Sequence, residues 1–345
     1  FEMKAMVLKR WGEKLSFEEI PDPEPKFSEV IIRVYACAPD QFDVTIRDGR
    51  AGGNLPLILG HEIAGVVVSV GKGVEHFREG DRVVAHPYLT CGHCKFCQVG
   101  RETLCQNFKG YLGVHANGGY AEFVAVPEKN LCRFPDGIDF ALATTIVSPV
   151  ATPLKALKTR AKIQPGQTVL IVGACGGVGI HAVQIAKAFG ANVIAVDIDD
   201  EKLSAAEDLG ANYLVNSMKK DFSDEVLEIT NGKGADAVLE LVGTDMTLPK
   251  SFRSIARAGV LVIVGFQPGK IFQCDPTRFV DDEILVTGSR YVNKAELSEA
   301  TEWVGSGRIK PIISGTYDLK DAEQALQDLS SGKIFGRAPI QILEN

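Results

Sequence analysis

Four cysteines lie close together in the run Cys-Gly-His-Cys-Lys-Phe-Cys-Gln-Val-Gly-Arg-Glu-Thr-Leu-Cys, separated by two, two and seven residues. Thiols at this spacing can converge on one tetrahedral ion, and zinc with four thiolates is a closed structural site without an open position for chemistry. The other cysteines are scattered along the chain, which disfavours the alternative of free or disulfide-bonded thiols in this run. We therefore predict a structural Zn²⁺ site with the ligands Cys91, Cys94, Cys97 and Cys105.

A glycine-rich turn follows a predicted buried strand at Thr168–Val172 and begins a predicted helix. Its pattern is Ala-x-Gly-x-x-Gly at Ala174, Gly176 and Gly179, with alanine where the usual fingerprint has its first glycine. Small residues let the backbone approach a pyrophosphate, and the helix N-terminus offers it N–H groups. A second predicted strand ends at Asp197, where a carboxylate binds the ribose diol and repels a 2′-phosphate. We predict a dinucleotide site that prefers NAD to NADP; the alternative is a purely structural turn.

The composition limits the partners of the protein. The formal net charge of −7 and a pI near 5.5 argue against a nucleic-acid surface. We expect no membrane segment, because the longest candidate apolar run, Val66–Val70, has only the length of a strand and is too short to span a bilayer. Clustered cysteines without a visible signal peptide fit a reducing cytoplasm. The expected partner is a small-molecule substrate of a soluble, cytoplasmic protein.

The elements that must position these motifs change in character near residue 150. Residues 3–148 contain short apolar runs separated by Gly, Pro and Asp turns, which is typical of β-rich structure. Residues 150–290 alternate predicted strands with predicted helices, a pattern that indicates a parallel sheet covered on both faces. A length of 345 residues suggests about two domains. The predicted fold class is α/β, with a β-rich domain and a doubly wound parallel sheet.

Several motifs together resemble those of the medium-chain dehydrogenase/reductase superfamily, the zinc-type alcohol dehydrogenases. Besides the cysteine run, the matching stretches are Leu59–Val67, Gly80–Val83, Gly118–Phe123, Gly173–Gly179 and Lys333–Arg337. The resemblance covers essentially the full chain. It implies a GroES-like catalytic domain with the zinc lobe (residues 1–150 and 291–345), a Rossmann NAD-binding domain (residues 151–290) and an active site in the cleft. It also implies a homodimer or homotetramer.

Carried over one residue at a time, the resemblance implies a set of cofactor contacts. Asp197 and Lys202 fall on the adenosine ribose, and Arg337 falls on the pyrophosphate, for which its bidentate guanidinium is suited. Loops that touch the nicotinamide end contribute most of the others. The full set is Thr152, Ala174, Gly176, Gly177, Val178, Gly179, Asp197, Lys202, Val242, Val264, Gly265, Phe266, Ser289, Arg290 and Arg337.

The sequence departs from this family at the catalytic metal. The usual ligands are a Cys, the His of Gly-His-Glu, and a second Cys or an acidic residue. Here Asp40 and Ser148 stand at the two outer positions, and Cys37 lies three residues too early. In one interpretation, Asp40, His61 and Glu62 hold zinc with water as the fourth ligand. In the other, the catalytic zinc is lost, as in the similar acryloyl-CoA reductases, which reduce a conjugated C=C bond.

The proton route is altered as well. Phe42 stands where these enzymes usually carry a Ser or Thr, and Thr45 stands where a relay His is common. Asp40, Thr45 or a bound water would therefore have to act as acid and base. We predict an NAD-dependent enzyme that transfers hydride between the cofactor and a small or medium alcohol/carbonyl pair, with an apolar substituent facing Phe42. The alternatives are a zinc-independent enoyl-CoA or enone reductase and a non-catalytic nicotinamide-binding relative.

Overall fold

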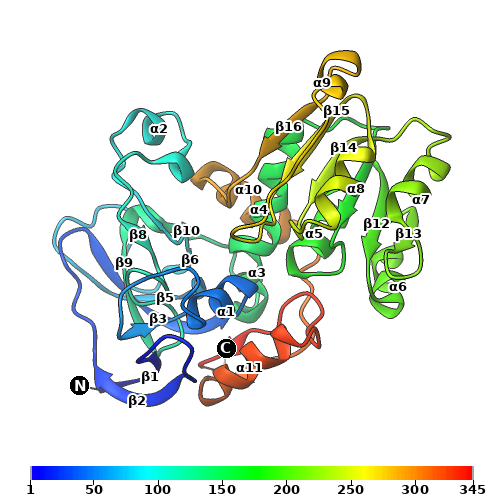
Figure 1. The fold of residues 1–345 in the computed structure, drawn as a ribbon. Coiled ribbons are helices and arrows are strands. Elements are labelled where there is room, and N and C mark those ends of the chain that lie inside the picture. Colours follow the sequence, from blue (N-terminus) through cyan, green and yellow to red (C-terminus); the bar gives the residue numbers. More distant parts are fainter. Residues whose placement is uncertain (1, 344–345) are drawn as a thin grey trace. The chain divides into compact units, whose positions relative to one another are not determined.

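The computed structural model describes residues 2–343, and within them the chain forms two compact units (Figure 1). The first unit joins residues 2–148 with Val292–Gly307 and residues 311–343. The second unit comprises Pro149–Tyr291 and Arg308–Lys310. Each unit has its own sheet and its own buried core.

The first unit is rich in antiparallel β-structure. Its larger sheet has the order β10-β6-β5-β3-β18-β17, with β9 also paired to β3. A smaller sheet has the order β2-β1-β4, and β7 pairs with β8. The strands are β1 (Glu2–Leu8), β2 (Ser16–Pro21), β3 (Glu29–Ala38), β4 (Leu57–Ile58), β5 (Glu62–Val70), β6 (Arg82–Ala85), β7 (Tyr88–Leu89), β8 (Gly110–Tyr111), β9 (Phe123–Pro127), β10 (Leu131–Arg133), β17 (Tyr317–Asp318) and β18 (Ile340–Gln341).

The pairing of β3 with β5 and β18 positions the candidate site. Glu62, the first residue of β5, lies opposite Ala38 at the end of β3. Ile340 of β18 lies opposite Cys37, so the C-terminal part of the chain returns to the same edge. The helices of this unit are α1 (Gln41–Arg47), α2 (Lys95–Gln98), α3 (Phe140–Thr145), α10 (Lys294–Gly305) and α11 (Ala322–Ser330).

The second unit contains a six-stranded parallel sheet of order β13-β12-β11-β14-β15-β16. Its strands are β11 (Thr168–Val172), β12 (Asn192–Asp197), β13 (Tyr213–Asn216), β14 (Ala235–Glu240), β15 (Ile255–Ile263) and β16 (Leu285–Gly288). Its helices are α4 (Ala151–Leu154), α5 (Gly177–Ala188), α6 (Asp200–Asp208), α7 (Phe222–Ile229), α8 (Thr247–Arg253) and α9 (Thr277–Asp281). The strand order reverses between β11 and β14, and ligands bind at the carboxyl ends of strands at such a switch point. The predicted α/β fold with a parallel sheet is confirmed.

One long helical run was not predicted. Residues 140–161 are helical throughout, with wide turns at Ile146–Val150, around Pro149, and at Lys155–Ala161. By length and composition the run is apolar enough to cross a membrane, so the expectation that the longest apolar run has only the length of a strand was wrong. Since 94% of its most apolar stretch is buried inside the protein, it has the burial of a core helix.

Candidate functional site

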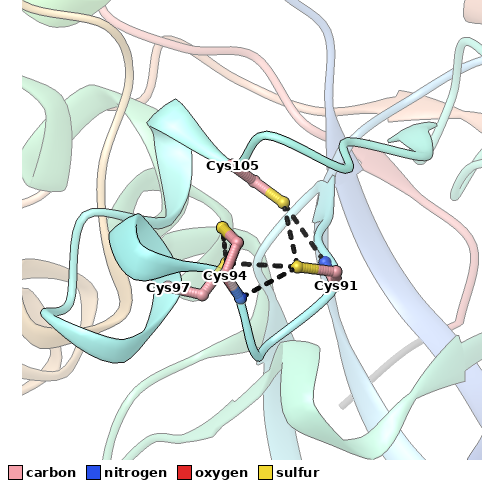
Figure 2. Close-up of side chains that lie close together, drawn as sticks. All are labelled: Cys91, Cys94, Cys97 and Cys105. Carbon is pink, nitrogen blue, oxygen red and sulfur yellow. Dashed lines mark hydrogen bonds between the residues drawn. The ribbon is translucent and has the colours of Figure 1, made fainter.

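The four predicted zinc ligands converge in the segment Cys91–Cys105, which we call the Cys lobe (Figure 2). Cys91 Sγ lies 3.5 Å from Cys105 Sγ and 4.0 Å from Cys97 Sγ, and Cys94 Sγ lies 3.6 Å from Cys97 Sγ. Zn–S bonds of about 2.3 Å place the sulfurs of a tetrahedral site about 3.8 Å apart. These three separations are close to the tetrahedral spacing, and all four sulfur atoms lie within 4.8 Å of one another, as a shared zinc ion requires.

Backbone N–H groups support the sulfurs as thiolates. The amides of Cys91 and Cys94 donate to Cys105 Sγ and Cys91 Sγ, each at 3.3 Å. Backbone hydrogen bonds from Cys97 and Gln106 lower the pKa of Cys94 to about 6. Burial raises the pKa of Cys97 to about 12, so a cation is needed to hold all four sulfurs as thiolates together.

A second cluster, which we call the His61 cluster, forms where β3 leads into α1. Asp40 caps α1: its Oδ1 accepts hydrogen bonds from the amides of Phe42 (2.7 Å) and Asp43 (3.1 Å). Its Oδ2 lies 3.4 Å from Nε2 of His61, which directly precedes β5. One ligand atom from each of Asp40, His61 and Glu62 lies within 4.8 Å of the others. The structure thus brings the three predicted residues together.

Asp43 and Tyr120 belong to this cluster and were not predicted. Asp43 is completely buried, and its Oδ1 lies 3.3 Å from Nδ1 of His61. Its Oδ2 accepts a hydrogen bond of 3.0 Å from the Tyr120 hydroxyl. A carboxylate on one ring nitrogen fixes the histidine orientation and turns the other nitrogen toward a ligand. The sequence does contain a signal for Asp43, because it follows Asp40 at the three-residue spacing of a helix capping box.

Arg337 lies in the His61 cluster through an ion pair with Glu62. Its Nη2 and Nε donate to the two oxygens of Glu62 at 2.8 and 2.9 Å, and both side chains are buried. Nη2 also lies 4.0 Å from Asp40 Oδ2. The sequence placed Arg337 on the cofactor pyrophosphate; in this structure these two nitrogens serve Glu62. That cofactor contact stays a prediction.

The charges of the His61 cluster shift its protonation. Burial alone would raise the pKa of Asp40, but the positive charges of His61 and Arg337 outweigh it and hold that pKa below its usual range. Burial alone would lower the pKa of His61, yet Asp40 and Asp43 raise it well above the usual value. Burial raises the pKa of Glu62 to about 7 against the opposing effect of Arg337. The bidentate geometry is that of an ionised carboxylate.

A zinc ion fits the His61 cluster by distance and by charge. Two ligands at about 2.1 Å in a tetrahedron lie about 3.4 Å apart, which matches the distance of 3.4 Å between Asp40 Oδ2 and His61 Nε2. A charge-assisted hydrogen bond would be shorter, at about 2.8 Å. Three carboxylates face one guanidinium here, so with a neutral histidine two negative charges are uncompensated. Each oxygen of Glu62 accepts one hydrogen bond from Arg337 and keeps a second lone pair for a metal, but the positive charge of Arg337 opposes a cation there.

Aromatic rings extend from His61. The Phe42 ring packs edge-on against His61 (6.0 Å between centroids) and Tyr111 (6.1 Å). Tyr111 in turn contacts Tyr88 (4.7 Å) and Phe108 (4.6 Å). Phe42, Tyr111 and Phe108 are only half-buried, so His61 is bordered by partly accessible aromatic surface.

Thr45 is a weaker acid–base candidate than Asp40. Its hydroxyl donates back to the carbonyl of Gln41 in the same helix at 3.0 Å, so that proton is committed to α1. Asp40 instead keeps Oδ2 directed at the imidazole. Ser148, at the third ligand position of the family pattern, is buried in the wide helical turn at Ile146–Val150.

The glycine-rich turn in the second unit has the form of a pyrophosphate cradle. Gly176 is the N-cap of α5, and Gly177 and Val178 begin the helix. A Cβ on Gly176 would meet only Gly173 O, at 3.7 Å, whereas a Cβ on Gly179 would lie 2.0 Å from the same oxygen. Ala174 is buried beneath the turn. Gly176 therefore faces space that a phosphate can occupy, and Gly179 is required by the fold.

The ribose end of the predicted site is organised by two carboxylates. Asp197 ends β12, and its oxygens accept hydrogen bonds from the amides of Cys175 (2.7 Å) and Ile198 (2.8 Å). Asp199 caps α6 by accepting from the amide of Lys202 at 3.2 Å. Asp197 and Lys202 thus lie at the carboxyl end of β12 and the start of α6, next to the glycine-rich turn.

Glu240 organises the predicted nicotinamide loops and was also missed. It is completely buried at the end of β14, and its Oε1 accepts from the amides of Val242 and Gly243, both at 2.8 Å. Its carbonyl accepts from Val264 and Gly265 at 2.9 and 3.0 Å. The two predicted loops are therefore joined through one residue, with Val242 and Phe266 exposed beside them.

Two buried hydroxyls provide a fit for the cofactor. Within residues 2–343, Thr152 Oγ1 and Ser289 Oγ are buried without a hydrogen-bond partner. Buried polar groups are normally hydrogen-bonded, so such orphans indicate a missing ligand or water. Both residues were predicted near the nicotinamide, whose carboxamide is a suitable partner. Arg290 is exposed, and its carbonyl accepts from Lys155 Nζ at 2.9 Å.

Comparison with known proteins supports this description. The chain matches the alcohol dehydrogenase GroES-like domain at residues 26–136 and the zinc-binding dehydrogenase family at residues 177–306. The NAD-dependent alcohol dehydrogenase of Sulfolobus acidocaldarius is 34% identical, over 99% of this chain and 100% of that protein. The acryloyl-coenzyme A reductase of Sulfurisphaera tokodaii is 30% identical, over 98% of this chain and 100% of that protein. The crystal structure of AibC aligns with a TM-score of 0.94 at 34% identity, over 99% of this chain and 96% of that chain.

A GroES-like unit with a four-cysteine lobe, joined to a doubly wound nucleotide-binding unit, defines the zinc-containing class of dehydrogenases. The chain belongs to the medium-chain dehydrogenase/reductase superfamily, with the zinc-type alcohol dehydrogenases among its relatives. The resemblance inferred from its motifs is confirmed.

Proposed function

We propose that this chain is an NAD-dependent oxidoreductase that interconverts an alcohol and its aldehyde or ketone by hydride transfer. The observation that carries the proposal is the Asp40–His61 pair, held at zinc-ligand spacing in the catalytic unit of this superfamily. The NAD-dependent alcohol dehydrogenase relative supports the reaction class and the cofactor. Asp197 supports NAD over NADP, since its carboxylate would repel a 2′-phosphate.

The protein groups have separate roles in this proposal. A bound nicotinamide cofactor would carry the hydride, and Asp40 and His61 would hold a zinc ion that would supply a Lewis acid for the substrate oxygen. Asp43 orients His61 through Nδ1, and Tyr120 holds Asp43 in place. Asp40 Oδ2 lies 3.4 Å from His61 Nε2, and Asp40 is less buried than Asp43, so Asp40 is our candidate for moving the alcohol proton.

The aromatic surface beside His61 indicates the kind of substrate. Phe42 replaces a hydroxyl side chain with a ring, and Tyr111 and Phe108 extend that ring surface. Aromatic surfaces bind apolar groups through burial and favour other rings in offset or edge-on contacts. We propose small or medium alcohols whose carbon substituent is apolar and lies against Phe42.

One observation favours a second candidate, the reduction of a conjugated C=C bond. Both oxygens of Glu62 accept hydrogen bonds from Arg337, whose positive charge competes with a metal ion for that carboxylate, whereas the usual site has three protein ligands. The acryloyl-coenzyme A reductase relative supports this alternative. A reaction of this kind needs a general acid near the double bond and no Lewis acid on an alcohol oxygen.

Counting zinc and comparing two substrate classes separates the candidates. Zinc per chain is measured before and after chelation, and both forms are assayed with alcohols and with enones or enoyl thioesters. Two zinc ions, and alcohol oxidation that is lost on chelation and in Asp40→Ala, would support the dehydrogenase. One zinc with chelator-resistant enone reduction would favour the alternative. No turnover of either class would leave a nicotinamide-binding protein without catalysis.

A further inference from the structure

Asn293 stands at the N-cap of α10 but does not cap it. An Asn at this position usually accepts a hydrogen bond from the second or third amide of its own helix; here no side-chain cap bond forms. Asn293 Oδ1 instead accepts from the backbone N–H and the hydroxyl of Thr103, at 3.3 and 3.2 Å. Thr103 belongs to the Cys lobe, two residues before Cys105. Both residues are buried. The Asn293 side chain therefore contacts the Cys lobe and leaves α10 without a side-chain cap.

The preceding residue is held in the same way. The carbonyl of Val292 lies 2.8 Å from Nε2 of His86, and both residues are buried. The His86 backbone is fixed in turn, because Asn130 Nδ2 donates to its carbonyl at 2.7 Å. Two consecutive residues, Val292 and Asn293, are thus clamped inside the first unit.

The chain enters the second unit one residue earlier, at a strained position. Tyr291 has a φ of +47°, which is unusual for a bulky residue and is maintained only where the surroundings enforce it. On its other side, the Ser289 amide donates to Ile263 O at 3.0 Å, and Lys155 holds the carbonyl of Arg290. The loop Ser289–Tyr291 is therefore bounded by fixed contacts at both ends.

We propose that the Thr103–Asn293 bond makes the Cys lobe a positioning element for the cofactor loop Ser289–Tyr291. The clamp on Val292–Asn293 fixes where the loop ends and maintains the left-handed conformation of Tyr291. That conformation aims Ser289 and Arg290 for the nicotinamide end. The structural zinc, by ordering Thr103, thereby contributes to cofactor affinity as well as to stability. This inference rests on the proposed NAD site.

Three variants at the start of α10 test the bond. Asn293→Ala removes the acceptor, whereas Asn293→Asp keeps an oxygen for Thr103. Lys294→Ala is the matched control, since that side chain is exposed at the next position. The measurements are the Kd for NADH by fluorescence titration, the zinc content and the Tm. We expect a Kd about 5- to 10-fold higher for Asn293→Ala, within the range of coupling through a packed network. Asn293→Asp and Lys294→Ala should retain the wild-type Kd, and zinc content should not change.

The outcomes are distinct. A lower Tm with an unchanged Kd in Asn293→Ala would mean that the bond is only structural, and would overturn the inference while leaving the proposed function intact. If Asn293→Ala does not fold, Thr103→Val removes the hydroxyl donor and should raise the Kd by a smaller factor; an unchanged Kd there overturns the inference. A wild-type protein that binds no NADH would overturn the proposed cofactor site and this inference together.

Discussion

Two glycines of the same motif should respond to the same added methyl group with very different losses of stability. Gly176→Ala places a Cβ 3.7 Å from the nearest protein atom, which is ordinary van der Waals contact, at a φ of −71° that any residue can adopt. Gly179→Ala places it 2.0 Å from Gly173 O and 2.7 Å from the carbonyl carbon of Ala174, where backbone must move. Overpacking typically costs about 1–3 kcal/mol, and a clash with backbone belongs at or above that range. We expect Gly179→Ala to lower the free energy of unfolding by about 3 kcal/mol and Gly176→Ala by less than about 1 kcal/mol.

A larger side chain at Gly176 should then separate binding from folding. Gly176→Val fills the space in which we place the pyrophosphate and keeps it from the helix amides. Losing two hydrogen bonds to a charged group, at about 1.5–3 kcal/mol each, should weaken NADH binding at least about 100-fold. The assay is a fluorescence titration with NADH, beside a thermal melt of each variant. Wild-type affinity in Gly176→Val would refute the assignment of the cradle. Equal destabilisation by the two alanine variants would refute the packing argument.

Further predictions concern the metal sites, the cofactor and assembly. Cys94→Ser should remove one zinc per chain and lower the Tm far more than it lowers cofactor affinity; unchanged stability without zinc would contradict the structural role. Asp197→Ala should relax discrimination against NADP(H), measured as the ratio of the two Kd values, and tighter NADPH than NADH binding by the wild type would contradict the NAD preference. Because the pKa of His61 is raised, the imidazole holds a proton at pH 7 when no metal is bound. Zinc binding should therefore release about one proton, and zinc affinity should fall as the pH falls. Calorimetry in two buffers of different ionisation enthalpy measures the number of protons released. Sedimentation should show a dimer or tetramer, and a 37.2 kDa monomer at micromolar concentration would refute this.

Local patterns predicted much of the fold and one metal site. The Cys lobe was predictable because its ligands lie within one short run. The strand–turn–helix around Gly176 was predictable because its elements follow one another directly in the sequence. The Arg337–Glu62 ion pair could not be predicted from local patterns, because its members are 275 residues apart in the sequence. The pairing of β18 with β3 brings the C-terminal part of the chain to this site. Glu240 carries no motif, and its role follows from burial beneath two loops.

The helix at residues 140–161 was missed for a different reason. Its pattern is interrupted by Pro149, and a proline inside a helix normally ends or kinks it. The wide turn at Ile146–Val150 accommodates that residue without ending the run. Sequence periodicity does not reveal such a turn, so only Ser148 and Thr152 of this segment were interpreted from the sequence.

The two oxygens of Asp40 serve different structures, and this limits how the site can change. One oxygen starts α1, while the other faces His61. A cysteine at this position would restore the thiolate that zinc favours but would leave the first amides of α1 without their acceptor, at a cost of about 1 kcal/mol. The Asp43 side chain would still accept a hydrogen bond from the backbone N–H of residue 40 and would still orient His61. A change from this carboxylate site to a thiolate site therefore carries a cost in helix stability, so the chemistry of the site is tied to the folding of a two-turn helix.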